Sequence, residues 1–148
     1  MIGLFIAWIL SKTILIAVML SAVICQGIKI VLNVIKDKKG VSIQDLVVTG
    51  GMPSTHSALV SSLFAILLLE TGLNSVTVIA TVLFIIVITD SMGVRRTAGE
   101  EAKLMNKIIK MKKLNIKQLS YSRGHKPIEV LAGIFIGFSI AFLVFFIL

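Results

Sequence analysis

The stretch GGMPSTHSAL, residues 50–59, places two glycines, a proline, three hydroxyl side chains and one of the two histidines at the start of an apolar run. These polar groups stand out, because 57% of the 148 residues are hydrophobic and the mean hydropathy is +1.03. Such values exceed those of a soluble domain of this length. The chain is therefore expected to be a membrane protein, with a polar cluster where one of its helices begins.

Four apolar stretches are long enough, at about 20 residues each, to cross a hydrocarbon core about 30 Å thick. They cover residues 13–35, 53–69, 75–94 and 127–148. Pro53 is expected to start the second helix, where its missing N–H has no partner to lose. A shorter run, residues 2–10, either lengthens the first helix or lies at the interface. The sequence predicts an all-α polytopic membrane helical bundle of about four transmembrane helices, in one domain covering residues 1–148.

The basic residues indicate the orientation. Of fifteen Lys and Arg, only Lys12 lies outside segments 29–39 and 95–126, and the link at 70–75 carries none. By the positive-inside rule, residues 36–52 and 95–126 face the cytoplasm and both termini lie on the other side. We expect a multi-pass protein of the cell (inner) membrane.

Two cytoplasmic segments have helical patterns of their own. Apolar and charged residues alternate at helical spacing over residues 98–110, which predicts an amphipathic helix at the interface, under anionic headgroups. In the polar link before the second helix, the pattern of residues 43–48 is compatible with a short amphipathic turn.

A polar stripe runs along the end of the first helix. Gln26, Lys29, Asn33 and Lys36 recur at spacings of three and four residues, which places them on one face. A lysine inside the membrane is costly unless it snorkels or faces a polar interior. The stripe favours a polar site for Lys29, whereas Lys36 alone is typical of a snorkelling anchor.

The predicted topology gathers the unusual polar residues at one membrane face. Two histidines, a helix N-terminus and several cations suit a phosphate group, because cations neutralise its charge while one histidine attacks and the other protonates the leaving oxygen. This chemistry needs no metal or cofactor, and the lone Cys25 provides no cysteine metal site. The residues that gather are Lys29, Lys36, Ser54, His56, Asp90, Arg95, Arg96, His125 and Glu129.

Three segments resemble the divergent branch of the type 2 phosphatidic acid phosphatase superfamily, which is related to the vanadium-dependent haloperoxidases. They are GGMPSTHSALVSSL (50–63), DSMGVRRTAGEEAKLMN (90–106) and GHKPIEVLAG (124–133). The similarity extends from about residue 13 onward.

The first two family motifs match with substitutions. The first is a lysine followed seven residues later by arginine and then proline. Lys29 and Lys36 match it, with lysine in place of arginine and Asp37 in place of proline. The second, Pro-Ser-Gly-His, is similar to residues 53–56, with Thr55 in place of glycine.

The third motif has an arginine, a histidine six residues later and an acid four further on. Only His125 and Glu129 match it, since the Ser122-Arg123 pair stands too close to His125. Arg95 or Arg96 is expected to provide the positive charge of the missing arginine from a distance.

The resemblance implies that His125 is the nucleophile, His56 the acid, and Glu129 the group that orients His125. The phosphate-binding residues would be Lys29, Lys36, Ser54, Thr55, Arg95 and Arg96, with Asp90 in support.

The leading hypothesis is an integral-membrane phosphatase acting on a lipid phosphate or diphosphate at the cytoplasmic face. The alternative is a non-catalytic protein that binds or transports phosphate-bearing lipids with the same pocket. A purely structural membrane subunit is a third reading. The expected partners are membrane lipids and a lipid phosphate substrate but no nucleic acid, and the sequence is compatible with a homo-oligomer.

Overall fold

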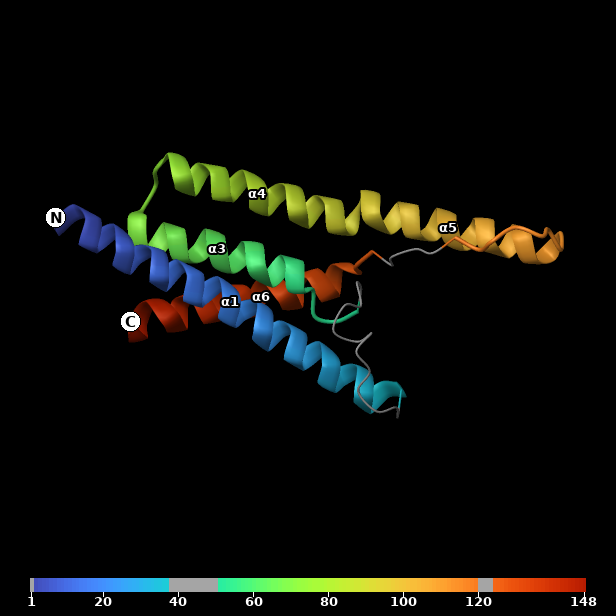
Figure 1. The fold of residues 1–148 in the computed structure, drawn as a ribbon, viewed down its shortest axis with the longest axis horizontal. Coiled ribbons are helices and arrows are strands. Elements are labelled where there is room, and N and C mark those ends of the chain that lie inside the picture. The colour runs from blue at the N-terminus through green and yellow to red at the C-terminus, as the bar shows by residue number, and fades with distance from the viewer. Residues whose placement is uncertain (1, 38–50, 120–123) are drawn as a thin grey trace.

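The computed structural model describes residues 2–37, 51–119 and 124–148. Every regular element in these residues is an α-helix: α1 (Ile2–Asp37), α3 (Thr55–Thr71), α4 (Ser75–Met92), α5 (Val94–Met111) and α6 (Pro127–Ile147) (Figure 1). Stretches of α1, α4–α5 and α6 are long and apolar enough to cross a membrane, and α3 is a shorter apolar helix. The prediction of an all-α membrane bundle is confirmed.

The first helix is longer than the predicted span. It begins at Ile2 and continues to Asp37 without a break, so the run 2–10 lengthens it. The predicted turn at 43–48 and the Ser122-Arg123 pair lie outside the described residues.

The start of α3 differs from the prediction that Pro53 begins the helix. The helix begins at Thr55, and Ser54 is its N-cap, accepting a hydrogen bond from the N–H of Ser57 at 3.3 Å. A serine hydroxyl satisfies one of the unpaired N–H groups at a helix start, which proline cannot do. Pro53 therefore lies just before the helix, where it is buried.

Small residues allow α3 and α6 to pack closely. A Cβ on Gly133 would overlap the carbonyl oxygen of Ser54, and a Cβ on Gly137 would overlap the hydroxyl of Ser61 and the carbonyl of Ala58. Such spacing of small residues brings helix backbones together in membranes. The Gly133-x-x-x-Gly137 pattern is the sequence signal that could have predicted this contact.

The packing places the helix ends in two groups. The start of α1 and the end of α6 lie at one end of the bundle (Figure 1). The beginnings of α3 and α6 and the junction between α4 and α5 lie at the other end. The apolar core between them is built from Ala17, Ala65, Ile66, Ala141 and Val144.

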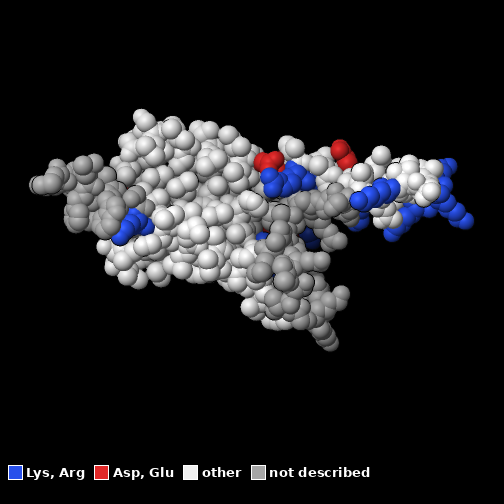
Figure 2. Space-filling model, viewed as in Figure 1, with Lys and Arg blue, Asp and Glu red and all other residues white. Residues whose placement is uncertain are grey.

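The amphipathic helix predicted after the third span is α5. It continues the direction of α4 beyond Gly93 and extends away from the rest of the bundle (Figure 1). Among the described helices it contacts only α4. Figure 2 shows basic side chains along this extension, whereas the visible surface of the packed helices is mostly uncharged.

Candidate active site

His56 and His125 line the same cavity, which has a volume of about 150 Å³. His56 belongs to the first turn of α3, and His125 lies two residues before α6. The end of α4 and the start of α5 complete the lining. The other lining residues are Ile86, Val87, Asp90, Ser91 and Arg95. The structure thus brings together four of the residues singled out from the sequence: both histidines, Asp90 and Arg95.

Backbone contacts hold the segments that form this cavity. The N–H of His125 donates to the carbonyl of Ser91 at 3.1 Å, and the N–H of Ser54 donates to the carbonyl of Glu129 at 2.9 Å. Gly124 lies so close to the backbone of Arg96 that a side chain there would overlap it. The position of His125 is therefore set by α4 and α5 as well as by its own helix.

The ring of His125 is buried, with 3% of the residue exposed. Neither ring nitrogen has a hydrogen-bond partner among the described residues. Burial lowers the pKa of His125 below its ordinary value. The charge of Glu129 opposes this, and the positive charges of Lys29, His56 and Arg95 lower the pKa further. The neutral imidazole is thereby favoured, and this is the form that can attack phosphorus.

Glu129 has a different partner from the one expected. One of its carboxylate oxygens accepts the N–H of Lys126 at 3.0 Å, across the first turn of α6. A glutamate at the third position of a helix commonly reaches back to the N-cap in this way. The spacing of His125 and Glu129 matches the family motif, but in this structure Glu129 acts on His125 through its charge and makes no hydrogen bond with the ring.

The two neighbouring arginines have separate partners. Arg95 lines the cavity, and its Nη2 and Nε lie 2.9 and 3.1 Å from one carboxylate oxygen of Asp90. Arg96 pairs instead with Glu100 at 3.1 Å and is not among the lining residues. From the sequence, either residue could provide the positive charge of the arginine that the third motif lacks. The geometry favours Arg95, because Arg95 lines the cavity.

Two residues of the stripe on α1, Gln26 and Lys29, contact the second motif. Lys29 is buried, with 3% exposed, and its Nζ donates to the Thr55 hydroxyl at 3.1 Å. That hydroxyl donates in turn to the Gln26 side chain at 2.9 Å. Lys29 therefore faces a polar interior, as the spacing predicted. Thr55, which replaces the glycine of the family motif, makes this contact with Lys29 and immediately precedes His56.

Other predicted residues lie apart from the cavity. The Ser54 hydroxyl is fully buried and accepts from the Ser57 hydroxyl at 2.9 Å in addition to capping α3. The side chain of Lys36 lies outside the described part of the chain. Ile86, Val87 and Ser91 line the cavity without having been predicted, and their nearness to Asp90 along α4 is the signal that could have found them.

Comparison with known proteins agrees with the resemblance. The model of a family described as the Divergent PAP2 family matches residues 10–140. The chain is similar to the uncharacterized membrane protein YuiD of Bacillus subtilis (strain 168), with 39% identity over 101 residues. The alignment covers 57% of this chain and 64% of that protein, which is less than two thirds of the relative's length. No solved structure matches the chain.

Proposed function

This chain belongs to the Divergent PAP2 family, and from that premise we propose that it is an integral-membrane phosphatase of the cell membrane. Its substrate is a lipid phosphate or diphosphate, which it hydrolyses at the cytoplasmic face. The observation that carries the proposal is the shared cavity: His56 and His125, far apart in the sequence, line it together with the guanidinium of Arg95.

The chemistry divides between the two histidines. A ring nitrogen of neutral His125 bonds to phosphorus while the bond from phosphorus to the leaving oxygen breaks, and His56 donates its proton to that oxygen. Water then attacks the phosphohistidine, His56 accepts a proton from that water, and inorganic phosphate leaves. Both histidines return to their starting forms. Arg95 neutralises the non-bridging oxygens throughout.

The form of the cavity supports a lipid as the substrate. A volume of about 150 Å³ accommodates a phosphate group but not acyl or isoprenyl chains. Ile86 and Val87 line the cavity from within the apolar part of α4, and 56% of Ile86 is exposed. A phosphate held between the histidines therefore has an apolar exit beside it, along the surface of α4 that faces the bilayer.

A second candidate is a protein that binds or transports phosphate-bearing lipids without hydrolysing them. One observation favours it: Glu129 caps α6, and the ring of His125 has no hydrogen-bond partner within the described residues. A nucleophilic imidazole is usually oriented by such a partner.

Release of inorganic phosphate from purified protein separates the two. Phosphatidate, phosphatidylglycerophosphate and isoprenyl phosphates are the substrates to screen in detergent. Phosphate release that disappears in His125→Ala supports the phosphatase. Tight binding of these lipids without phosphate release supports the binding protein. A protein in which replacing both histidines changes neither lipid binding nor phosphate release would be a structural subunit.

A further inference from the structure

Most of the protein's positive charge lies on one extension of the fold. Residues 94–119, which we call the basic arm, comprise α5 and the chain that folds back along it. The basic arm carries eight Lys and Arg against two Glu, in a protein whose net charge is +8. Figure 2 shows this charge away from the packed helices. Neither the cavity of the two histidines nor the helix packing accounts for it, except at Arg95.

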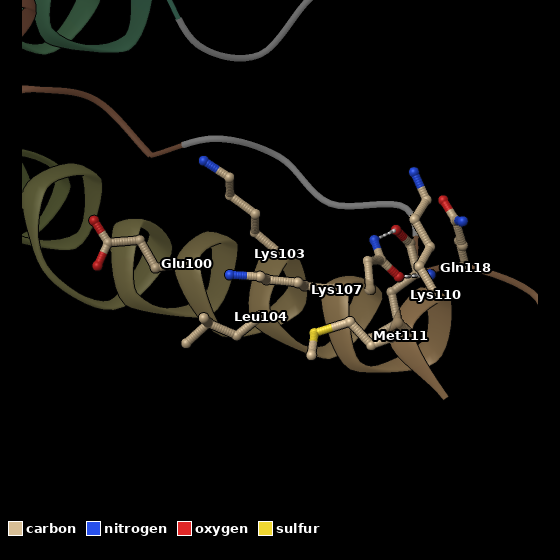
Figure 3. Close-up of a pocket in the computed structure, with 9 residues that line it drawn as sticks. Glu100, Lys103, Leu104, Lys107, Lys110, Met111 and Gln118 are labelled. Carbon is tan, nitrogen blue, oxygen red and sulfur yellow. Dashed lines mark hydrogen bonds between the residues drawn. The ribbon is translucent and has the colours of Figure 1, made fainter. Parts of the chain in front are cut away.

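A groove of about 940 Å³ lies between α5 and the returning chain. Lys103, Lys107 and Lys110 line it from α5, and in Figure 3 they project from one stretch of that helix with Leu104 and Met111 beside them. The three lysines follow one another at helical spacing, so their ammonium groups can act on one ligand. Such a groove suits an anion that also has an apolar part.

A specific contact joins α5 to the returning chain. The side-chain oxygen of Asn106 accepts the N–H of Leu119 at 2.8 Å, and its side-chain nitrogen donates to the carbonyl of Leu119 at 2.9 Å (Figure 3). One amide thus pairs with both backbone groups of a residue on the returning chain. The second wall of the groove is fixed to the first.

Large apolar side chains are exposed beside the lysines. Leu104 is 61% exposed, Met111 72% and Ile116 61%. A nucleic acid or an acidic peptide would match the charge but would leave these side chains in water. An anionic bilayer surface matches both, because headgroup phosphates attract lysine and the layer beneath accepts apolar side chains.

We propose that the basic arm binds anionic phospholipids at the surface of the bilayer that α4 crosses. The groove lysines hold a headgroup phosphate, and Leu104 and Met111 insert beside it. In Figure 1, α5 continues the direction of α4 beyond Gly93 and extends away from the packed helices. Lipid binding therefore requires the arm to bend at this glycine. Its backbone angles, φ −97° and ψ −99°, already depart from the helix there.

The test uses the full-length protein in nanodiscs of phosphatidylcholine with increasing phosphatidylglycerol. A polarity-sensitive fluorophore is attached at Met111→Cys, since the native Cys25 is buried. The emission is expected to shift to the blue as phosphatidylglycerol increases, and salt is expected to reverse the shift. This readout does not depend on phosphatase activity, and His125→Ala should leave it unchanged.

A matched pair of triple variants tests the groove itself. K103Q/K107Q/K110Q removes the lysines that line it, and we expect the phosphatidylglycerol fraction at half-response to rise by roughly threefold or more. K112Q/K113Q/K117Q removes the same charge from positions outside the lining and should change that fraction by much less. Equal effects of the two triples would overturn the groove as the binding site. An emission wavelength that does not change with the phosphatidylglycerol fraction would overturn lipid binding. A blue shift caused instead by an RNA oligonucleotide or an acidic peptide would assign the arm to that partner.

Discussion

Adjacent arginines with the same chemistry have different places in this molecule. Arg95 is held by Asp90 at the cavity, whereas Arg96 pairs with Glu100 away from it. The sequence shows only that two arginines follow one another near the end of a helix. Which one serves the site depends on the direction of each side chain as the chain passes Gly93, and this direction is a property of the fold.

The two arginines provide a matched comparison. We expect Arg95→Ala to weaken the binding of vanadate, a phosphate analogue, by roughly tenfold or more, because it removes a charge-assisted hydrogen-bond donor from the cavity. Arg96→Ala should change the affinity by less than about twofold, since its partner is the exposed Glu100. Inhibition of phosphate release by vanadate measures both. Equal losses would contradict the assignment of Arg95.

In the proposed mechanism, the pKa of His125 sets the pH dependence of phosphate release. Because burial lowers this pKa from its ordinary value of 6.5, the ring loses its proton at a lower pH and is neutral above it. We expect the acid limb of kcat/KM to lie below pH 6.5. The charge of Glu129 raises the pKa of His125, so Glu129→Gln should move the acid limb to still lower pH. A shift toward higher pH in that variant would show that Glu129 acts in another way.

The same buried ring makes stability depend on pH. When folding lowers the pKa of a histidine, its contribution to the free energy of unfolding is complete at pH values above the pKa of the unfolded chain, where the ring is neutral in both states. That contribution is lost as the pH falls below 6.5 and through the pKa of the folded state.

At the scale of helices, sequence periodicity predicted that a helix exists more reliably than it predicted where the helix begins or which helices it contacts. The amphipathic pattern of residues 98–110 correctly indicated a helix, because alternation at helical spacing depends only on local geometry. Its direction relative to α4 was not predictable, since among the described helices α5 contacts only α4. The start of α3 was placed two residues early, because a capping serine competed with proline.

The contact between α3 and α6 can be tested at one glycine. Gly137→Leu inserts a side chain where the backbones of the two helices touch, and we expect a loss of about 2 kcal/mol or more in the free energy of unfolding. Ser139→Leu on the same helix is the control, since that position is exposed. Denaturation in mixed micelles followed by circular dichroism measures both variants. Similar stability of the two would contradict the close packing.

At the scale of the whole molecule, composition indicated much of the architecture. Four apolar stretches predicted the membrane bundle, because crossing a bilayer sets a minimum length for each helix. Their arrangement was not predictable from hydropathy, which does not say which faces meet. The nearness of His56 and His125 was predicted from the expected topology. His56 lies in the first turn of α3 and His125 lies two residues before α6, and both helices start at the same end of the bundle.

The orientation of the bundle in the membrane is open to direct measurement. The start of α1 and the end of α6 lie at one end of the bundle, away from the beginnings of α3 and α6. The basic segments should face the cytoplasm, so both termini should lie on the opposite side. A phosphatase reporter fused after Leu148 is expected to be active only outside the cytoplasm. A reporter active inside would reverse the proposed location of the site.

The most direct test of the proposed function is a search for a phosphate bound covalently to His125. The protein in detergent is mixed with ³²P-labelled lipid phosphate, quenched within the first turnover, and the labelled residue is identified by mass spectrometry. We expect a phosphohistidine at His125 that is absent in His125→Ala. In His56→Ala it should form readily from a nitrophenyl ester, whose leaving group needs no proton, and poorly from an alkyl ester. Hydrolysis without any phosphohistidine at His125, or equal losses in both histidine variants on both esters, would contradict the account.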